Sequence, residues 1–339
     1  MSAFVVMTAM PPTKGHIRLI EFAHALGEGT VVMIQTQPGE PFCNERVSAL
    51  IDHFHDWGNI EFRHMHRTLP QDPETPGFRE LWQKIMHNNG CEPEDLIVSS
   101  EAYGMWLAAL TGATFIPYDP ERLLTPTKAT DVRTDPIGNF AQIANEFQKN
   151  LRINVTIFGA ESVGKTTLSR SLAKLMNGQW FFEWARPYLE TVGPDITVAS
   201  MEAIWHGQKA LEIHSHDFYD KPFAFYDTDL YSTIGYWAMP HWADHLGPVP
   251  QGLIADATPN DLYLIPRSNI PFEEDPIRYG GDRREASDQY WIAVAEQYGL
   301  NYVVLESPDR TDRIYEAMQA LRPFEKRLKD SLAFDRGGF

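Results

Sequence analysis

The sequence predicts a protein of the α/β class with two domains, each built on a parallel sheet. Short apolar runs rich in β-branched residues recur along the chain and are typical of buried parallel strands. These runs are residues 3–9, 30–35, 95–99, 114–118, 153–157, 180–182, 223–226, 261–265 and 302–305. Segments with the spacing of amphipathic helices lie between many of them. The length of 339 residues fits about two domains.

The most specific motif is a phosphate loop in the middle of the chain. After the run at 153–157 the sequence reads GAESVGKTT over residues 159–167, which fits the pattern G-x-x-x-x-G-K-[ST]. The residues expected to bind phosphate are Gly159, Glu161, Ser162, Gly164, Lys165, Thr166 and Thr167. The glycines let backbone N–H groups point at phosphate, at the positive end of the following helix. Lys165 adds charge and Thr166 is placed to bind Mg²⁺, so the motif predicts ATP and Mg²⁺ as ligands. A glycine turn before an ordinary helix is the alternative.

The composition limits the classes of partner. The chain has a formal net charge of −17 and a pI near 5.1, and its basic residues do not cluster. Because binding to phosphate backbones needs clustered Lys and Arg, we expect no nucleic-acid or membrane surface. Cys43 and Cys91 form no C-x-x-C pair, which favours reduced thiols and a cytoplasmic protein. The N-terminus does not read as a signal peptide, and no apolar stretch reaches membrane-spanning length.

A second motif lies at the first strand-to-helix turn, where α/β sheets place their ligands. Thr13-Lys14-Gly15-His16 follows the run at 3–9 and opens a predicted helix. A [T/H]-x-G-H sequence at this place resembles the signature of the nucleotidyltransferase superfamily. Gly15 lets the backbone approach phosphate, and His16 can stabilise charge on the phosphate under attack. A capped helix start with an incidental histidine is the alternative.

The order of the later motifs extends the resemblance. Residues 100–104 (SEAYG) follow a predicted strand, and residues 128–133 (KATDVR) are similar to the second signature of nicotinamide-mononucleotide adenylyltransferases. With the phosphate loop downstream, the chain resembles the bifunctional NadR-type proteins, which join an adenylyltransferase to a ribosylnicotinamide kinase. It departs from the family's opening motif at Met7, Ala9 and Thr13. Enteric relatives carry a helix-turn-helix ahead of these domains, for which we expect no room here.

The resemblance implies that residues 1–134 are a Rossmann-like nucleotidyltransferase. In this domain the phosphate of nicotinamide mononucleotide would attack the α-phosphorus of ATP, giving NAD and pyrophosphate. The residues expected to bind and stabilise the phosphates are Thr13, Gly15, His16, Thr130 and Arg133. Trp82 would stack on the nicotinamide ring, with a place in the core as the alternative. Arg46 is a weaker candidate, for which a surface role is open.

The resemblance also implies a P-loop ribosylnicotinamide kinase in residues 153–325. Helical spacing in residues 135–152 predicts a packed connecting helix, and residues 326–339 read as a mobile, charged tail. Residues 183–190 (EWARPYLE) follow the family, and Glu183, Arg186 and Tyr188 would bind the nucleoside. Gln208 belongs to a Gly-Gln pair of the family and is a further substrate-binding candidate. A bland amphipathic helix is the alternative for residues 183–190.

Two carboxylates, Asp227 and Asp229, follow the run at 223–226. A kinase needs such a group once to hold Mg²⁺ and once to accept the proton of the 5′-hydroxyl. We expect Asp227 to be the base or the metal partner and Asp229 the other. A polar strand end or helix cap is the alternative.

A segment near residue 275 resembles the family's P-W-x-x-D-G-x-R, and its Asp275 and Arg278 would bind substrate. Arg283 and Arg284 follow two glycines where such kinases carry a mobile lid, and an arginine from the lid would stabilise the γ-phosphoryl in transit. Exposed, solubilising charge is the alternative for one of these two arginines.

Together these features predict an NAD salvage enzyme that phosphorylates ribosylnicotinamide and then adenylates the product. Its partners would be small molecules, and a homo-oligomer is open. One alternative is a working kinase joined to an N-terminal domain that only senses nucleotide, which the residues at positions 7, 9 and 13 favour. A kinase for a different nucleoside is another.

Overall fold

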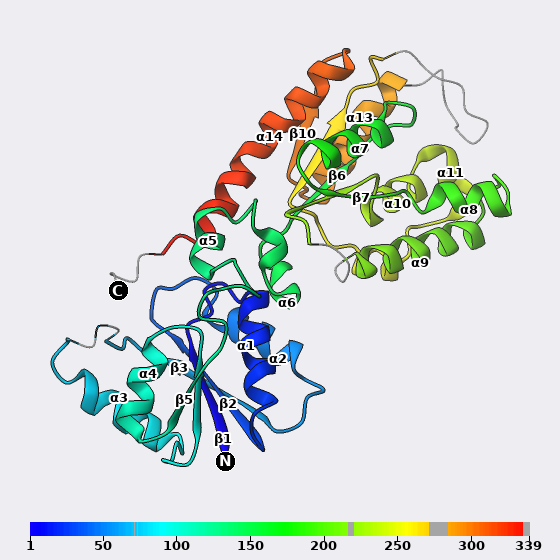
Figure 1. The fold of residues 1–339 in the computed structure, drawn as a ribbon. Helices are drawn as coiled ribbons and strands as arrows, with labels where there is room; N and C mark the ends of the chain where they lie inside the picture. The colour runs from blue at the N-terminus through cyan, green and yellow to red at the C-terminus, as the bar shows by residue number, and fades with distance from the viewer. Residues whose placement is uncertain (71, 73, 216–219, 271–283, 335–339) are drawn as a thin grey trace. The chain divides into compact units, whose positions relative to one another are not determined.

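The chain forms two compact units, Met1–Leu151 with the C-terminal residues from Arg327, and Arg152–Lys326 (Figure 1). The structure, a computed structural model, describes residues 1–70, 72, 74–215, 220–270 and 284–334, without the side chains of residues 284–286. Each unit holds one five-stranded, fully parallel sheet. The predicted α/β class with two parallel sheets is therefore confirmed.

The sheet of the N-terminal unit has the strand order β3-β2-β1-β4-β5. Its strands are β1 (Ser2–Met7), β2 (Gly29–Thr36), β3 (Ile60–His66), β4 (Leu96–Ser99) and β5 (Thr114–Pro117). Its helices are α1 (Lys14–His24), α2 (Cys43–His53), α3 (Phe78–Asn88), α4 (Tyr103–Thr111) and α5 (Ala129–Thr134). Figure 1 shows α1 and α2 on one face of the sheet and α3 and α4 on the other. The strand order reverses between β1 and β4, and a doubly wound sheet opens its ligand crevice at that point.

Strand β3 was not predicted from the sequence. It pairs with β2 from Thr30↔Ile60 to Thr36↔His66 and lies at the edge of the sheet. Most of its residues are exposed or half-buried, and only Met65 is buried. An edge strand of this kind lacks the continuous apolar run by which the other strands were found.

The segment from 135 to 151 packs within the N-terminal unit. It contains a 3₁₀ turn at Phe140–Gln142 and the short helix α6 (Asn145–Gln148), rather than one continuous helix. Ile143 forms an isolated antiparallel bridge with Thr13, and the ring of Phe147 meets that of Phe42 edge-on at 5.5 Å. The prediction of a packed segment with a short helix is confirmed, although the helix covers only residues 145–148.

The sheet of the C-terminal unit has the order β10-β9-β6-β8-β7. Its strands are β6 (Ile153–Ile157), β7 (Gln179–Phe181), β8 (Phe223–Tyr226), β9 (Leu262–Pro266) and β10 (Tyr302–Leu305). Its helices are α7 (Lys165–Leu175), α8 (Ala185–Val192), α9 (Val198–His214), α10 (Leu230–Trp237), α11 (Pro240–Leu246), α12 (Gln251–Asp256), α13 (Arg284–Gln297) and α14 (Arg310–Ser331). Strands β7, β8 and β6 are successive neighbours, so their carboxyl ends share one edge of the sheet.

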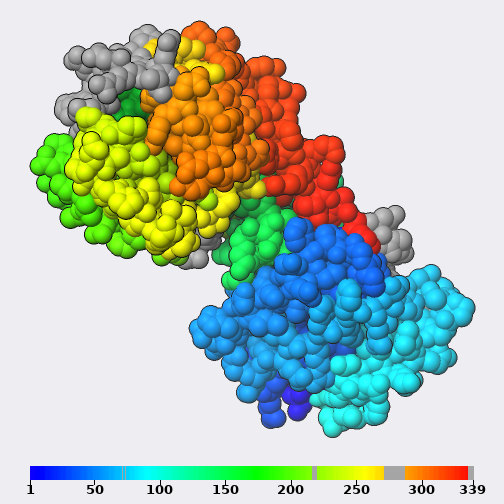
Figure 2. Space-filling model, turned by 180° about the vertical axis from the view of Figure 1, so that it is seen from behind, coloured from blue at the N-terminus to red at the C-terminus, as the bar shows by residue number. Residues whose placement is uncertain are grey.

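Helices α13 and α14 form part of the molecular surface, in orange and red in the space-filling view (Figure 2). Helix α14 continues to Ser331, into residues 326–339 that the sequence predicted as a tail. The buried side chains of Leu321 and Leu328 show why, because a spacing of seven residues keeps both on one side of the helix. Across the described residues, none of the helices combines the length and apolar composition that crossing a bilayer requires.

Candidate active sites

A cavity of about 570 Å³ lies at the carboxyl ends of β1 and β4 in the N-terminal unit. The six residues predicted for the site of this domain all line the cavity: Thr13, Gly15, His16, Trp82, Thr130 and Arg133. They come from α1, α3 and α5, which are far apart in the sequence. The fold therefore brings the predicted segments to one place, the crevice expected from the strand order.

His16 is held as a neutral imidazole that can donate from Nε2. The backbone N–H of Thr13 lies 3.0 Å from Nδ1 of His16, and since an amide can only donate, Nδ1 accepts. The same two residues form a capping box at the start of α1. Burial and, after it, the charges of Arg122, Arg133 and Arg46 lower the pKa of His16 to about 4. The ring is thus uncharged at neutral pH, with its proton on Nε2.

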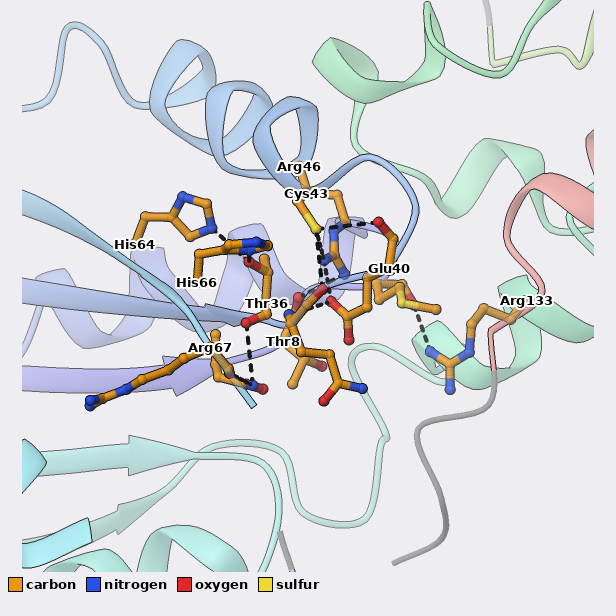
Figure 3. Close-up of polar contacts among 12 residues, drawn as sticks. Thr8, Thr36, Glu40, Cys43, Arg46, His64, His66, Arg67 and Arg133 are labelled. Carbon is orange, nitrogen blue, oxygen red and sulfur yellow. Dashed lines mark hydrogen bonds and ion pairs between the residues drawn. The ribbon is translucent and has the colours of Figure 1, made fainter. Parts of the chain in front are cut away.

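Arg46 and Glu40 form a fully buried ion pair beside this cavity. Nη2 of Arg46 lies 2.5 Å from Oε2 of Glu40, and neither side chain is exposed. Figure 3 shows Arg46 pointing from α2 towards Glu40 and Thr8, and the carbonyl of Thr8 accepts from Nη1 of Arg46 at 3.4 Å. The surface role left open for Arg46 is therefore wrong. Its charge instead adds to the positive potential at the carboxyl end of β1.

Arg133 is fixed at the rim of the same cavity. Its Nη1 donates to the carbonyl of Met10 at 2.5 Å, and its Nη2 donates to the hydroxyl of Thr130 at 3.1 Å (Figure 3 shows the first). A guanidinium held in this way retains N–H groups for a phosphate oxygen.

Trp82 contributes mainly to the core. It is 5% exposed, packs in the apolar cluster with Phe78 and Met86, and donates from Nε1 to the carbonyl of Pro70 at 3.0 Å. One part of the ring still lines the cavity. Sequence reasoning missed Trp106, Arg122 and Lys128, which line it as well. Trp106 on α4 and Arg122 on the loop after β5 belong to no motif, whereas Lys128 begins the KATDVR segment and was not proposed as a site residue.

The phosphate loop of the C-terminal unit has the expected backbone form. Gly159 and Gly164 have φ values of 127° and 87°, in the region that favours glycine, and α7 starts at Lys165 directly after the loop. Nζ of Lys165 donates to the carbonyls of Gly159 and Ala160 at 3.1 and 2.8 Å. A cavity of about 130 Å³ faces the loop, and the predicted residues that line it are Glu161, Ser162, Gly164, Lys165, Thr166, Thr167, Glu183 and Arg186. Tyr236 and Arg310 also line it and were not predicted.

Asp227 lies beside the phosphate loop, because β8 is the neighbour of β6. It is 2% exposed, and its Oδ1 has no hydrogen-bond partner among the described residues. Burial and, after it, the charge of Glu183 raise the pKa of Asp227 to about 7, and a hydrogen bond from Thr166 limits the rise. A buried, unsatisfied carboxylate oxygen next to the Thr166 hydroxyl fits a divalent cation.

The donor set also suits Mg²⁺ in particular. Within the described residues, no group of three or more His, Cys, Asp or Glu side chains could hold a metal ion. Mg²⁺ in phosphate-transfer sites is held by one or two carboxylates together with substrate phosphates and water, and so needs no such group.

Asp229 has a different environment. It caps α10, accepting from the N–H of Ser232 at 3.1 Å, and its other oxygen accepts from the hydroxyls of Tyr263 and Thr156 at 2.7 and 3.3 Å. Burial raises its pKa, and these hydrogen bonds oppose the rise. Neither Asp227 nor Asp229 lines the cavity at the phosphate loop, but the contacts of Asp229 are those of a buried helix cap.

A further cavity of about 180 Å³ shares Glu161, Glu183 and Tyr236 with the cavity at the phosphate loop. Gln208 lines it, whereas Tyr188 packs against the apolar cluster of this unit and lines neither cavity. The remaining candidates lie outside the described part of the chain. Asp275, Arg278 and Arg283 fall in residues 271–283, and Arg284 begins α13 without a described side chain.

Comparisons with known proteins agree with this arrangement. A family model described as an AAA domain matches residues 154–313. The trifunctional NAD biosynthesis/regulator protein NadR of Escherichia coli (strain K12) is 26% identical over 294 residues, covering 84% of this chain and 70% of NadR. The Salmonella typhimurium protein of the same description is 24% identical over 298 residues, with the same coverage.

Two solved structures share the fold over nearly the whole chain. One is of a NadR protein in complex with NR, with a TM-score of 0.62, 21% identity and coverage of 96% of this chain and 97% of that one. The other is of a NadR protein in complex with NAD and AMP-PNP, with a TM-score of 0.61, 21% identity and coverage of 100% and 98%. The resemblance predicted from the motifs is thereby confirmed across both units.

Proposed function

We propose that this chain, a relative of the NadR proteins over both of its units, converts ribosylnicotinamide to NAD in two ATP-dependent steps. The observation that carries this proposal is the pairing, in one chain, of two cavities built for phosphate. One holds a neutral histidine and arginines, and the other holds a phosphate loop and Glu183, with the buried Asp227 beside Thr166 of that loop. The sequence similarity to NadR over both units supports the same pair of reactions.

In the C-terminal unit, ribosylnicotinamide would be phosphorylated. Its 5′-hydroxyl attacks the γ-phosphorus of ATP, the hydroxyl proton passes to Glu183, and ADP leaves. Glu183 suits this role because it lines both the cavity at the phosphate loop and the adjoining cavity. Thr166 and Asp227 would hold Mg²⁺, which draws charge from the phosphates when bound. Lys165 would move from the carbonyls of its own loop to the β- and γ-phosphates.

In the N-terminal unit, the resulting mononucleotide would attack the α-phosphorus of a second ATP, and pyrophosphate would leave. The phosphate is itself the nucleophile, so the protein supplies position and charge. Nε2–H of His16 and the guanidinium of Arg133 would donate to the phosphate under attack. Free Cys43 and Cys91 support our further proposal of a reducing, cytoplasmic setting.

The test follows products by chromatography after incubation of the chain with ribosylnicotinamide, excess ATP and Mg²⁺. The unmodified chain is expected to give NAD. His16→Ala should accumulate the mononucleotide, because loss of such a donor slows transfer by about 10²–10³. Lys165→Ala should give no product from the nucleoside and should still form NAD from added mononucleotide.

Other outcomes separate the alternatives. If the unmodified chain stops at the mononucleotide, the N-terminal unit binds nucleotide without adenylyl transfer, as its residues Met7, Ala9 and Thr13 would allow. If no product forms while another nucleoside is phosphorylated, the proposed substrate is wrong.

A further inference from the structure

The two carboxylates of the proposed kinase site stand on separate connections. Glu183 follows β7 and Asp227 follows β8. The distance between their side chains therefore depends on how residues 183–184 and 227–229 are held relative to each other. One helix, α9, contacts both connections through two consecutive residues.

The first of these residues, Gln208, bonds to both connections. It is 2% exposed. Its Oε1 accepts from the backbone N–H of Trp184 at 3.2 Å, which directly follows Glu183. Its Nε2 donates to the carbonyl of Thr228 at 3.4 Å, which directly follows Asp227. Because an amide N–H can only donate and a carbonyl can only accept, the two ends of the Gln208 side chain are assigned by these partners.

Glu212, one turn further along α9, extends the connection. Its Oε1 accepts from Nε2 of Gln208 at 3.0 Å and from the backbone N–H of Leu230 at 2.9 Å. Burial and, after it, the charge of Asp229 raise the pKa of Glu212 to about 8. Leu230 is the first residue of α10, so the connection after β8 is held at two points.

Gly207 gives space for the ring of Trp184. A Cβ atom at position 207 would overlap the indole of Trp184. The ring can therefore lie against α9 only while position 207 is glycine. Both residues of the Gly-Gln pair noted in the sequence therefore hold Trp184, Gly207 by leaving space for its ring and Gln208 by bonding its backbone N–H.

The backbone between Asp227 and Asp229 needs such support. Thr228 has φ of 109°, a region that β-branched residues rarely adopt because it strains the backbone. A conformation of this kind persists only where surrounding contacts hold it. The hydrogen bond from Gln208 to the carbonyl of Thr228 is one such contact.

We propose that Gly207 and Gln208 are positioning residues that hold Glu183 and Asp227 at a fixed separation in the kinase site. The proposal rests on the kinase function proposed above for this unit. It replaces the role in substrate binding predicted for Gln208, since both ends of that side chain are engaged by the protein.

The test measures kcat and KM of nucleoside phosphorylation in the full chain, with Gln208→Met and Gly207→Ala. Gln208→Met keeps length and removes both bonds, and Gly207→Ala displaces Trp184. The matched control is Lys209→Met, because Lys209 pairs with Asp256 and not with either connection. In both test variants we expect kcat to fall about 10–100-fold with KM for nucleoside and ATP within about twofold.

Two results would overturn the proposal. A raised KM for the nucleoside with unchanged kcat would mean that Gln208 contacts substrate, and unchanged kinetics in both variants would mean that neither residue positions the site. If Gln208→Met fails to fold, as judged by circular dichroism, Gln208→Glu is judged by the same criteria. If the unmodified chain phosphorylates a different nucleoside, the same measurements are made with that nucleoside. A wrong substrate assignment is then distinguished from a failure of the positioning proposal.

Discussion

Asp227 lies at a site where function opposes stability. Its carboxyl is buried next to Glu183, and burial together with that charge raises its pKa to about 7. The folded state therefore binds a proton more tightly than the unfolded chain does. The contribution of this group to folding is favourable at low pH and is lost as the pH rises from about 4 to about 7.

We predict that Asp227→Asn stabilises the C-terminal unit while abolishing phosphorylation. The gain in unfolding free energy should grow between pH 4 and 7 and level off above, at up to about 4 kcal/mol. Calorimetric unfolding at several pH values measures it. The exposed Asp195→Asn serves as control and should change nothing, and a variant less stable than the parent at pH 8 would contradict the argument.

Most residues of the candidate sites could be predicted where a local motif marks them. Gly164, Lys165 and Thr166 needed only the loop pattern, because backbone N–H groups bind phosphate in a fixed spacing. Trp106 and Arg122 could not be found in this way, since their proximity to His16 arises only when α4 and the loop after β5 fold onto the sheet. For Arg46 the sequence left a surface role open. The side chain is instead buried in an ion pair with Glu40, six residues earlier in the chain.

At the scale of elements, helix α10 depends on its first turn. Asp229 caps the helix with one oxygen and joins it to β6 and β9 with the other, through Thr156 and Tyr263. These contacts keep α10 in place behind Asp227 and explain why a second carboxylate follows β8.

Asp229→Ala is expected to cost at least about 1 kcal/mol of unfolding free energy through loss of the cap, and more because two buried hydroxyls lose their acceptor. Chemical denaturation measures this cost. The milder Asp229→Asn should retain phosphorylation within about fivefold, in contrast to Asp227→Asn. Equal loss of activity in both Asn variants, with stability intact, would restore Asp229 as a catalytic residue.

The elements found from the sequence were those with a strong apolar pattern. Strands β8 and β10 occur at the predicted residues, because their runs are apolar throughout. The edge strand β3 was not predicted, because a strand at the edge of a sheet exposes polar side chains. The end of α14 was not predicted either, because Pro323 and the charged residues after it are typical of the end of a helix.

At the scale of the whole molecule, each unit contains its own cavity and its own reactive groups. The mononucleotide is therefore the one product that passes from the first proposed reaction to the second. A chain with one inactive unit should still carry out the other reaction.

We predict that mixing Lys165→Ala and His16→Ala proteins restores NAD formation from ribosylnicotinamide. The initial lag should shorten as protein concentration rises, because the intermediate passes through solution. A time course of NAD by absorbance after coupled reduction measures this. Each variant alone is the control, and absence of NAD from the mixture would mean that the intermediate is handed over within one chain.

The buried pair of Glu40 and Arg46 also limits how this protein can change over generations. Removing either charge alone would leave the other buried, at a cost of about 3–5 kcal/mol, whereas replacing both with apolar residues can be nearly neutral. Single substitutions at either position would thus be purged by selection. Positions 40 and 46 are expected to vary together among descendants of this sequence, or to stay as they are.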